Sequence, residues 1–167
     1  MSFELPTGHT LRHPRENDHP AIVAAITDWW DTPNRATIAM LLPRLFLQFF
    51  TKTSWVLESE SGEIAAFLIG FRSADDPTVA YIHFVGVDQH LRNEGVGRGL
   101  YENFFDTMKA AGCTEVRAIT GPFNARSLAF HKAMGFTAKG DTEVDGVLAF
   151  RDYDGPGGDR VLFTRAL

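Results

Sequence analysis

The chain has 167 residues, of which 44% are hydrophobic and 22% charged, and its length suits a single domain over residues 1–167. That composition excludes an intrinsically disordered chain. Sixteen Lys and Arg against 21 Asp and Glu give a formal charge of −5, which argues against a nucleic-acid partner and weakly favours a cationic ligand.

An opening strand and a helical region are predicted before residue 51. Residues 10–13 can form a short strand, and Pro20 marks the start of a helix whose apolar residues lie on one face. Residues 37–50 carry apolar side chains at spacings of three and four, interrupted by Pro43. This stretch is therefore predicted as one kinked helix or two short ones.

Three β-rich runs, separated by turn residues, predict three antiparallel strands in the middle of the chain. These runs are residues 55–58, 64–71 and 79–87. Beyond them, an apolar stripe that starts after Gly97 and ends at Gly112 predicts a long amphipathic helix.

The last third of the chain predicts a strand, a helix and two closing strands. The helix runs from about Asn124 to Gly135, a glycine that suits a helix C-terminus. The strands are residues 115–120, 147–150 and 160–164, and the last two are joined by the turn-rich residues 154–158. This order of elements predicts an α+β fold with a mixed sheet.

Nothing in the sequence indicates export or a membrane partner. The single cysteine, Cys113, cannot form an intrachain disulfide, and the six histidines show no metal-ligand spacing. No basic or apolar leader opens the chain, and no stretch approaches the ~20 apolar residues that cross a bilayer. We therefore expect a cytoplasmic protein without a metal, in which Cys113 packs at a helix-to-strand turn.

The most informative stretch runs from a strand through a glycine-rich loop into a helix. Gly95 and Gly97 let backbone N–H groups approach an anion without a Cβ in the way, and the helix start adds its positive dipole end. Such a site suits a pyrophosphate, although a turn without a ligand has the same glycine spacing. Leu100 stands where the dinucleotide-binding pattern needs a third glycine, and no Walker lysine precedes a Ser or Thr.

Two motifs together resemble the GNAT superfamily of N-acetyltransferases, and the resemblance spans roughly residues 10–136. Arg92-x-x-Gly95-x-Gly97, after an apolar strand, resembles the family's acetyl-CoA pyrophosphate loop. The second motif is Asn124-x-x-Ser127-x-x-Phe130-His131-x-x-x-Gly135-Phe136. It resembles the family pattern Asn-x-x-(Ala/Ser)-x-x-(Leu/Phe)-(Tyr/His)-x-x-x-Gly-Phe, in the expected order and on the expected elements.

The resemblance implies a GNAT-like mixed sheet of about six or seven strands, mostly antiparallel with a central splayed parallel pair, flanked by about four helices. It implies acetyl-CoA as the cofactor and makes a homodimer possible. The cofactor-binding residues implied are Val85 and Val87 through their backbone, Arg92, Asn93, Glu94, Gly95, Val96, Gly97 and Arg98 in the loop, and Asn124, Ser127 and Phe130.

Two of these positions, and Gly86 between Val85 and Val87, have structural explanations as well. Gly86 marks a bulge or a close backbone approach in its strand, or is merely tolerated there. In the family, a bulge at this place splays the parallel strands. Asn124 is also a preferred helix N-cap residue, and Ser127 also suits a solvated first turn.

Two histidines are the catalytic candidates. His131 stands where many family members have a tyrosine that protonates the departing thiolate, and it either does so or packs beside the cofactor sulfur. His83 is a candidate base for the amine proton, directly or through water, and Glu58 and His90 are the other candidates. A polar residue on the outward face of a half-buried strand would also explain His83.

The predicted function is direct transfer of acetyl from acetyl-CoA to a primary amine of a small molecule or peptide. A backbone N–H near Val85 and Val87 would stabilise the oxyanion. The alternative is a non-catalytic acyl-CoA sensor or interaction module. The sequence leaves the acceptor amine open.

Overall fold

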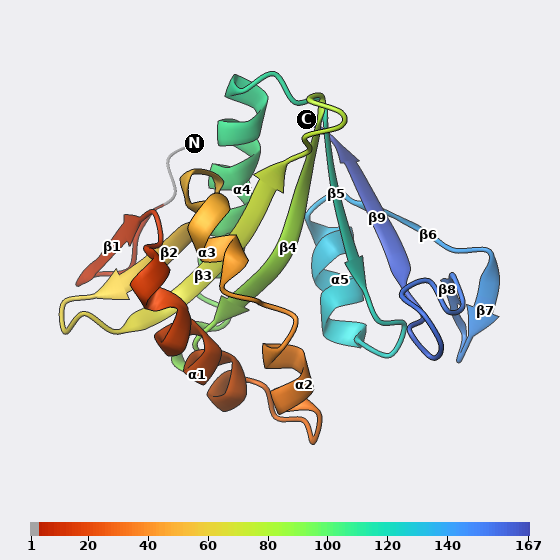
Figure 1. Ribbon diagram of the computed structural model, residues 1–167, viewed down its shortest axis with the longest axis horizontal. Coiled ribbons are helices and arrows are strands. Elements are labelled where there is room, and N and C mark those ends of the chain that lie inside the picture. Colours follow the sequence, from red (N-terminus) through yellow and green to blue (C-terminus); the bar gives the residue numbers. More distant parts are fainter. Residues whose placement is uncertain (1–3) are drawn as a thin grey trace.

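The computed structural model describes residues 4–167 and contains a seven-stranded sheet in the order β1-β2-β3-β4-β5-β9-β6. Its strands are β1 (His9–Arg12), β2 (Trp55–Ser59), β3 (Ile64–Arg72), β4 (Val79–Val87), β5 (Glu115–Thr120), β6 (Thr137–Lys139) and β9 (Val161–Ala166). All neighbours are antiparallel except β4 and β5, which are parallel. The sheet confirms the predicted α+β class (Figure 1).

Five α-helices cover the two faces of the sheet. They are α1 (His19–Trp29), α2 (Arg35–Ala39), α3 (Leu45–Phe49), α4 (Val96–Ala110) and α5 (Ala125–Ala133), with 3₁₀ turns η1 (Glu16–Asp18), η2 (Thr51–Thr53) and η3 (Gln89–Leu91). One helix more than expected is present because the stretch around Pro43 forms two short helices, α2 and α3. No helix in residues 4–167 is long and apolar enough to span a bilayer.

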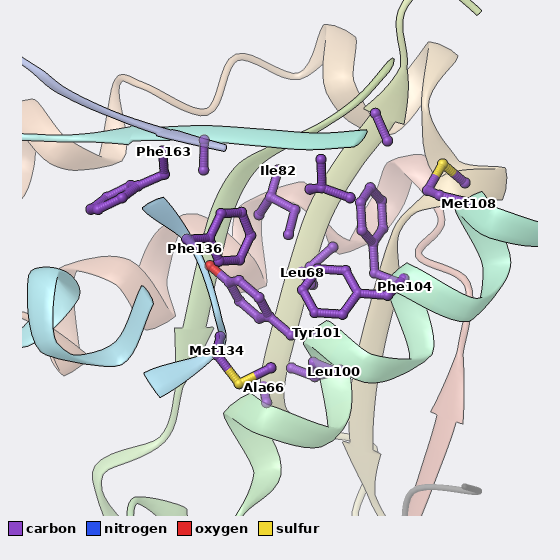
Figure 2. Close-up of a cluster of buried hydrophobic side chains, with 14 of the residues drawn as sticks. Ala66, Leu68, Ile82, Leu100, Tyr101, Phe104, Met108, Met134, Phe136 and Phe163 are labelled. Atoms are coloured by element: carbon purple, nitrogen blue, oxygen red, sulfur yellow. The ribbon is translucent and has the colours of Figure 1, made fainter. Parts of the chain in front are cut away.

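The core has two parts because β3 is buried on both faces. Ala66 and Leu68 join a cluster built with α4, whereas Phe67 and Ile69 join a second cluster built with α1, α2 and α3. This division follows the two-residue period of a strand. Figure 2 shows the first cluster, in which Leu100, Tyr101 and Phe104 of α4 pack toward Ala66, Leu68 and Ile82.

The parallel strands separate soon after they meet. Their pairing runs only from Val79↔Glu115 to Tyr81↔Arg117, after which β5 keeps β9 as its partner and β4 keeps β3. Figure 1 shows β4 and β5 diverging from this contact. Among the described strands, none pairs with the free edge of the second half of β4, as the resemblance implied.

The bulge in β4 lies at His83 and not at Gly86. Ile69 pairs with Phe84 and Gly70 pairs with Ile82, so His83 is the extra residue. Gly86 is in regular register opposite Phe67. It is instead a close approach, because an added Cβ would lie 2.6 Å from the Phe67 ring and 3.1 Å from the Trp30 ring.

Replacing Gly86 by alanine is expected to lower the free energy of unfolding by about 1–3 kcal/mol, since the methyl group overpacks the buried Phe67. Urea unfolding followed by circular dichroism measures the change. Gly62→Ala is an unsuitable control because that residue has a positive φ. Gly97→Ala provides the comparison, because its methyl group would meet its neighbours only at 3.6–3.8 Å. An unchanged Gly86→Ala midpoint would contradict the close packing.

Strands form at both predicted closing runs, residues 147–149 and 161–166, and the first of them pairs with a strand that the sequence did not predict. Residues 142–149 form a separate two-stranded sheet, β7 (Thr142–Val144) with β8 (Val147–Ala149), through a turn in which Asp145 and Gly146 both have positive φ. Only an isolated bridge, Phe150↔Arg160, joins β8 toward β9. The last strand, β9, pairs instead with β5 and β6.

Candidate acyl-transfer site

The loop before α4 presents a row of free backbone donors. Asn93 and Gly95 have φ values of 69° and 82°, and the helix begins with the Gly99 N–H donating to the Gly95 carbonyl at 2.9 Å. The N–H groups of residues 93–98 have no hydrogen-bond partner within residues 4–167. Free amides at the positive end of a 15-residue helix are suited to binding an anion.

Three predicted cofactor residues meet beside this loop. A Cβ added at Gly97 would lie 3.6 Å from the Phe130 ring and 3.8 Å from Cγ2 of Val87. Gly97 therefore sits at the junction of β4, α4 and α5. The absence of a side chain there keeps the helix start open between Val87 and Phe130.

The free edge of β4 carries the backbone groups of Val85 and Val87. The Asp88 N–H donates to the Ala65 carbonyl at 2.9 Å, so Asp88 points toward β3. Because successive residues of a strand direct their polar groups to opposite sides, Val85 and Val87 point away from β3, toward the space that β5 leaves. An extended ligand can pair with that edge.

Arg92 ties the loop to the body of the protein. Its Nη2 donates to the Trp29 carbonyl at 2.7 Å, and its Nε donates to the Val87 carbonyl at 3.3 Å. Burial lowers the pKa of Arg92, and the positive charge of Arg126 lowers it further, so the two guanidinium groups are close enough to repel. A bound anion would relieve this repulsion. Arg98 is exposed and lies 3.7 Å from Glu102.

Asn124 acts as the N-cap of α5, with its Oδ1 accepting the Ser127 N–H at 3.1 Å. This bond gives Asn124 the structural role foreseen for it. Asn93 and Glu94 are exposed in the loop, and Val96 is buried beneath it. Within residues 4–167, no hydrogen bond joins Asn124 to the α4 loop.

His131 is buried and both of its ring nitrogens are engaged. Nδ1 lies 2.8 Å from the Ser127 carbonyl and must donate to it, so Nε2 accepts from the Tyr101 hydroxyl at 3.0 Å. The ring stacks on Phe163 with centroids 4.2 Å apart. Burial lowers the pKa of His131, and burial raises the pKa of Tyr101, so both are neutral near pH 7.

Replacing His131 by phenylalanine is expected to reduce turnover only modestly, by less than about tenfold, while cofactor binding is retained. The free energy of unfolding should fall by about 1–3 kcal/mol because the buried Tyr101 hydroxyl loses its acceptor. Steady-state kinetics and urea unfolding measure the two effects. The double variant Tyr101→Phe/His131→Phe should recover part of the stability, and failure to recover any would contradict the pairing.

His83 lies on the face of β4 that is covered by α2, α3 and the segment between them, and this segment holds its ring. Its Nε2 is 2.5 Å from the Leu41 carbonyl, and its ring stacks on Phe46 with centroids 4.1 Å apart. Nε2 therefore donates, and Nδ1 has no hydrogen-bond partner within residues 4–167. Burial lowers the pKa of His83, which keeps the imidazole neutral at pH 7 with a lone pair available on Nδ1.

The other base candidates are less suitably placed. Glu58 accepts from Arg12, whose Nε lies 2.9 Å from Oε2, and so its carboxylate is already neutralised. His90 is exposed in η3.

Cys113 is buried at the turn between α4 and β5, and burial raises the pKa of its thiol, so the packing role expected for it fits. No cluster of three or more His, Cys, Asp or Glu within residues 4–167 could hold a metal.

A sheet that opens beside free amides at a helix start could accommodate an anionic, extended ligand against β4. The sequence matches the family model described as the acetyltransferase (GNAT) family over residues 23–136, and the chain belongs to that family. This match confirms the family and the acyltransferase class that the two motifs predicted. Comparison with curated proteins gave no match.

Solved structures share the fold at low sequence identity. Ard1 from Thermoplasma volcanium superposes with a TM-score of 0.70 at 20% identity, covering 96% of this chain and 99% of that one. Diaminobutyrate acetyltransferase EctA from Paenibacillus lautus, in complex with L-2,4-diaminobutyric acid and coenzyme A, gives 0.66 at 20%, covering 95% of each chain. The ribosomal-protein-S18-alanine N-acetyltransferase from Escherichia coli gives 0.62 at 21%, covering 95% and 93%.

Two contributors to the site had no predicted role, and a third, Phe46, was expected mainly to pack in the core. Tyr101 was one residue in an apolar stripe, and its hydroxyl turns out to be the partner of His131. Phe46 and the Leu41 carbonyl fix the ring of His83. The one local sequence signal was a tyrosine, Tyr101, on an otherwise apolar helix face. The two contacts of His83, with Phe46 and with the Leu41 carbonyl, join segments about 40 residues apart, so no local pattern predicts them.

Proposed function

We propose that this chain is an acetyl-CoA-dependent N-acetyltransferase that transfers acetyl directly to a primary amine of a small molecule or peptide. The observation that carries the proposal is the row of unpaired N–H groups at residues 93–98, which opens onto the free edge of β4. Family membership supports it, and so does the coenzyme A described in the EctA structure.

The residues present fit coenzyme A. The amides of residues 93–98 would hold the pyrophosphate, with Arg98 and Arg126 supplying nearby positive charge. The backbone of Val85 and Val87 would pair with the pantetheine arm, as a neighbouring strand would. Phe130, Ser127 and Asn124, on and before the first turns of α5, would line the same passage.

Bound acetyl-CoA supplies the activated acetyl thioester. The lone pair of the amine nitrogen forms the new bond to the acetyl carbon, the carbon–sulfur bond breaks, and its electron pair leaves with the sulfur. The amine proton passes to Nδ1 of His83, directly or through a water. This step matters because an alkyl amine of pKa about 10.4 is neutral only ~0.04% of the time at pH 7. Backbone N–H groups near Val85 and Val87 would hold the thioester oxygen.

His131 supports this site by position. Protonation of the leaving sulfur would require a proton on Nε2, but that nitrogen accepts the Tyr101 hydroxyl in the tautomer that the Ser127 carbonyl fixes. The geometry thus favours packing over proton transfer. The ring links α5 to α4 and to Phe163 of β9, and this keeps the first turn of α5 beside the α4 loop.

The experiment that tests the proposed function is thiol release from acetyl-CoA against a panel of primary amines, with mass spectrometry of the products. Amine-dependent release, with the amine gaining one acetyl group, is the expected result. Stabilisation of the protein by acetyl-CoA without release for any amine would favour the sensor instead. No stabilisation by acetyl-CoA would reject both. The expected single domain, cytoplasmic location and possible homodimer stay predictions.

A further inference from the structure

Five half-buried aromatic rings form a continuous strip on the His83 face of the sheet. The aromatic strip consists of Phe46 and Phe50 on and just after α3, Phe71 on β3, and Tyr81 and His83 on β4. Ring centroids in this strip are 4.1 Å apart for Phe46–His83, 4.9 Å for Phe50–Phe71 and 5.5 Å for Phe71–Tyr81. The proposed base is therefore one end of an aromatic surface.

The strip reaches the opening of the sheet. Tyr81 is the last residue of β4 that pairs with β5, and His83 is the bulged residue that follows. Burial raises the pKa of Tyr81 to about 12, and Tyr153 and Asp154 of the β8–β9 connection contribute to the rise, so that connection lies near the strip. Tyr153 is half exposed, and its ring lies 6.1 Å from the ring of Phe150.

The carboxylate nearest the strip, Asp154 of the β8–β9 connection, is already neutralised by an arginine. Its Oδ2 lies 2.7 Å from Nε of Arg160. This arginine cancels the charge that would attract a second ammonium group. A polycationic acceptor would thus gain little here, whereas an apolar body would remove aromatic surface from water.

We infer that the acceptor is a primary amine carried on an aromatic or large aliphatic group, which packs on the aromatic strip while its nitrogen reaches Nδ1 of His83. This inference rests on the proposed function and adds the substrate class to it. Two sources have this chemistry, namely a free arylalkylamine and a peptide whose first residue has a large apolar side chain. The low-identity fold neighbours do not distinguish them.

The test compares kcat/KM for 2-phenylethylamine, a tetrapeptide beginning with Phe, ethanolamine, spermidine and a tetrapeptide beginning with Glu. At least one of the two aromatic acceptors should exceed ethanolamine, spermidine and the Glu peptide by at least about tenfold. A higher kcat/KM for 2-phenylethylamine than for the Phe peptide would identify a small-molecule acceptor. A higher kcat/KM for the Phe peptide would identify a peptide acceptor. Phe71→Leu should reduce the ratio of the better aromatic acceptor to ethanolamine at least fivefold, about 1 kcal/mol.

Phe49→Ala is the matched control, because Phe49 also lies on α3 but is 76% exposed and makes no ring contact with the strip. It should leave the ratio unchanged. Equal or better turnover of spermidine or ethanolamine would overturn the inference while the proposed function stands. If no amine turns over, calorimetric titration of 2-phenylethylamine into the coenzyme A-bound protein separates the two claims. If 2-phenylethylamine binds, and binds more weakly to Phe71→Leu, the aromatic strip is a binding surface although the proposed function fails. If 2-phenylethylamine does not bind, the inference about the strip is overturned.

Discussion

Gly97→Leu is expected to weaken acetyl-CoA binding by at least about tenfold, or about 1.4 kcal/mol, without unfolding the protein. A side chain at this position grows from a Cβ that already contacts Phe130 and Val87, into the passage between β4 and α5. Helix stability should not fall, because leucine is a better helix former than glycine by about 0.8–1 kcal/mol. Isothermal titration calorimetry with acetyl-CoA measures the loss.

Gly97→Ala is the matched control for this variant. Its single methyl group would meet its neighbours at 3.6–3.8 Å, which is ordinary van der Waals contact, so binding should change far less than in Gly97→Leu. Both variants should keep the thermal midpoint of the native protein within a few degrees. Unaltered acetyl-CoA affinity in a folded Gly97→Leu protein would show that the cofactor passes elsewhere.

His83→Gln should lower kcat/KM by about 10²–10⁴ while acetyl-CoA affinity is retained, since glutamine can keep the bond to the Leu41 carbonyl but cannot accept the amine proton. Burial lowers the pKa of His83 below its usual value of 6.5, and the neutral form is the active one. In the native protein kcat/KM should therefore fall as the pH decreases through that lowered pKa. This acidic limb should be missing from the pH profile of His83→Gln.

His19→Gln separates the base from a structural contact, because His19 Nε2 bonds the Leu42 carbonyl at 2.8 Å, next to the carbonyl that holds His83. Both histidines anchor the same segment between α2 and α3. Only the loss of His83 should remove the acidic limb. A comparable loss of activity in the two variants, with identical pH profiles, would mean that His83 acts only by holding this segment.

The sequence was sufficient for most elements because their apolar periods are long. The apolar stripe of α4 and the continuous apolar run of β3 span 15 and nine residues, enough to identify their type. The three-residue strands β6 and β7 were missed, since such short runs carry no period. The Asp145-Gly146 pair, in contrast, is a local hairpin signal for β7 and β8, because both residues favour positive φ.

The site divides in the same way. The α4 loop is local in sequence, so its glycines and helix start predicted the free amides that the structure contains at residues 93–98. The bulge at His83 depends on the register between β4 and β3, and no local sequence pattern specifies that register. The bulge was therefore predicted at Gly86, three residues away. The hydrogen bond from the Arg92 guanidinium to the Trp29 carbonyl was not predicted either, because it depends on how α1 packs against the sheet.

Amide hydrogen exchange with coenzyme A and with pantetheine tests the central claim most directly. Pantetheine has the arm that would pair with β4 but no pyrophosphate. We predict that coenzyme A slows exchange at the amides of residues 93–98, which have no hydrogen-bond partner among residues 4–167, and that saturating pantetheine leaves their exchange fast. Equal exchange of these six amides with and without saturating coenzyme A would contradict the account.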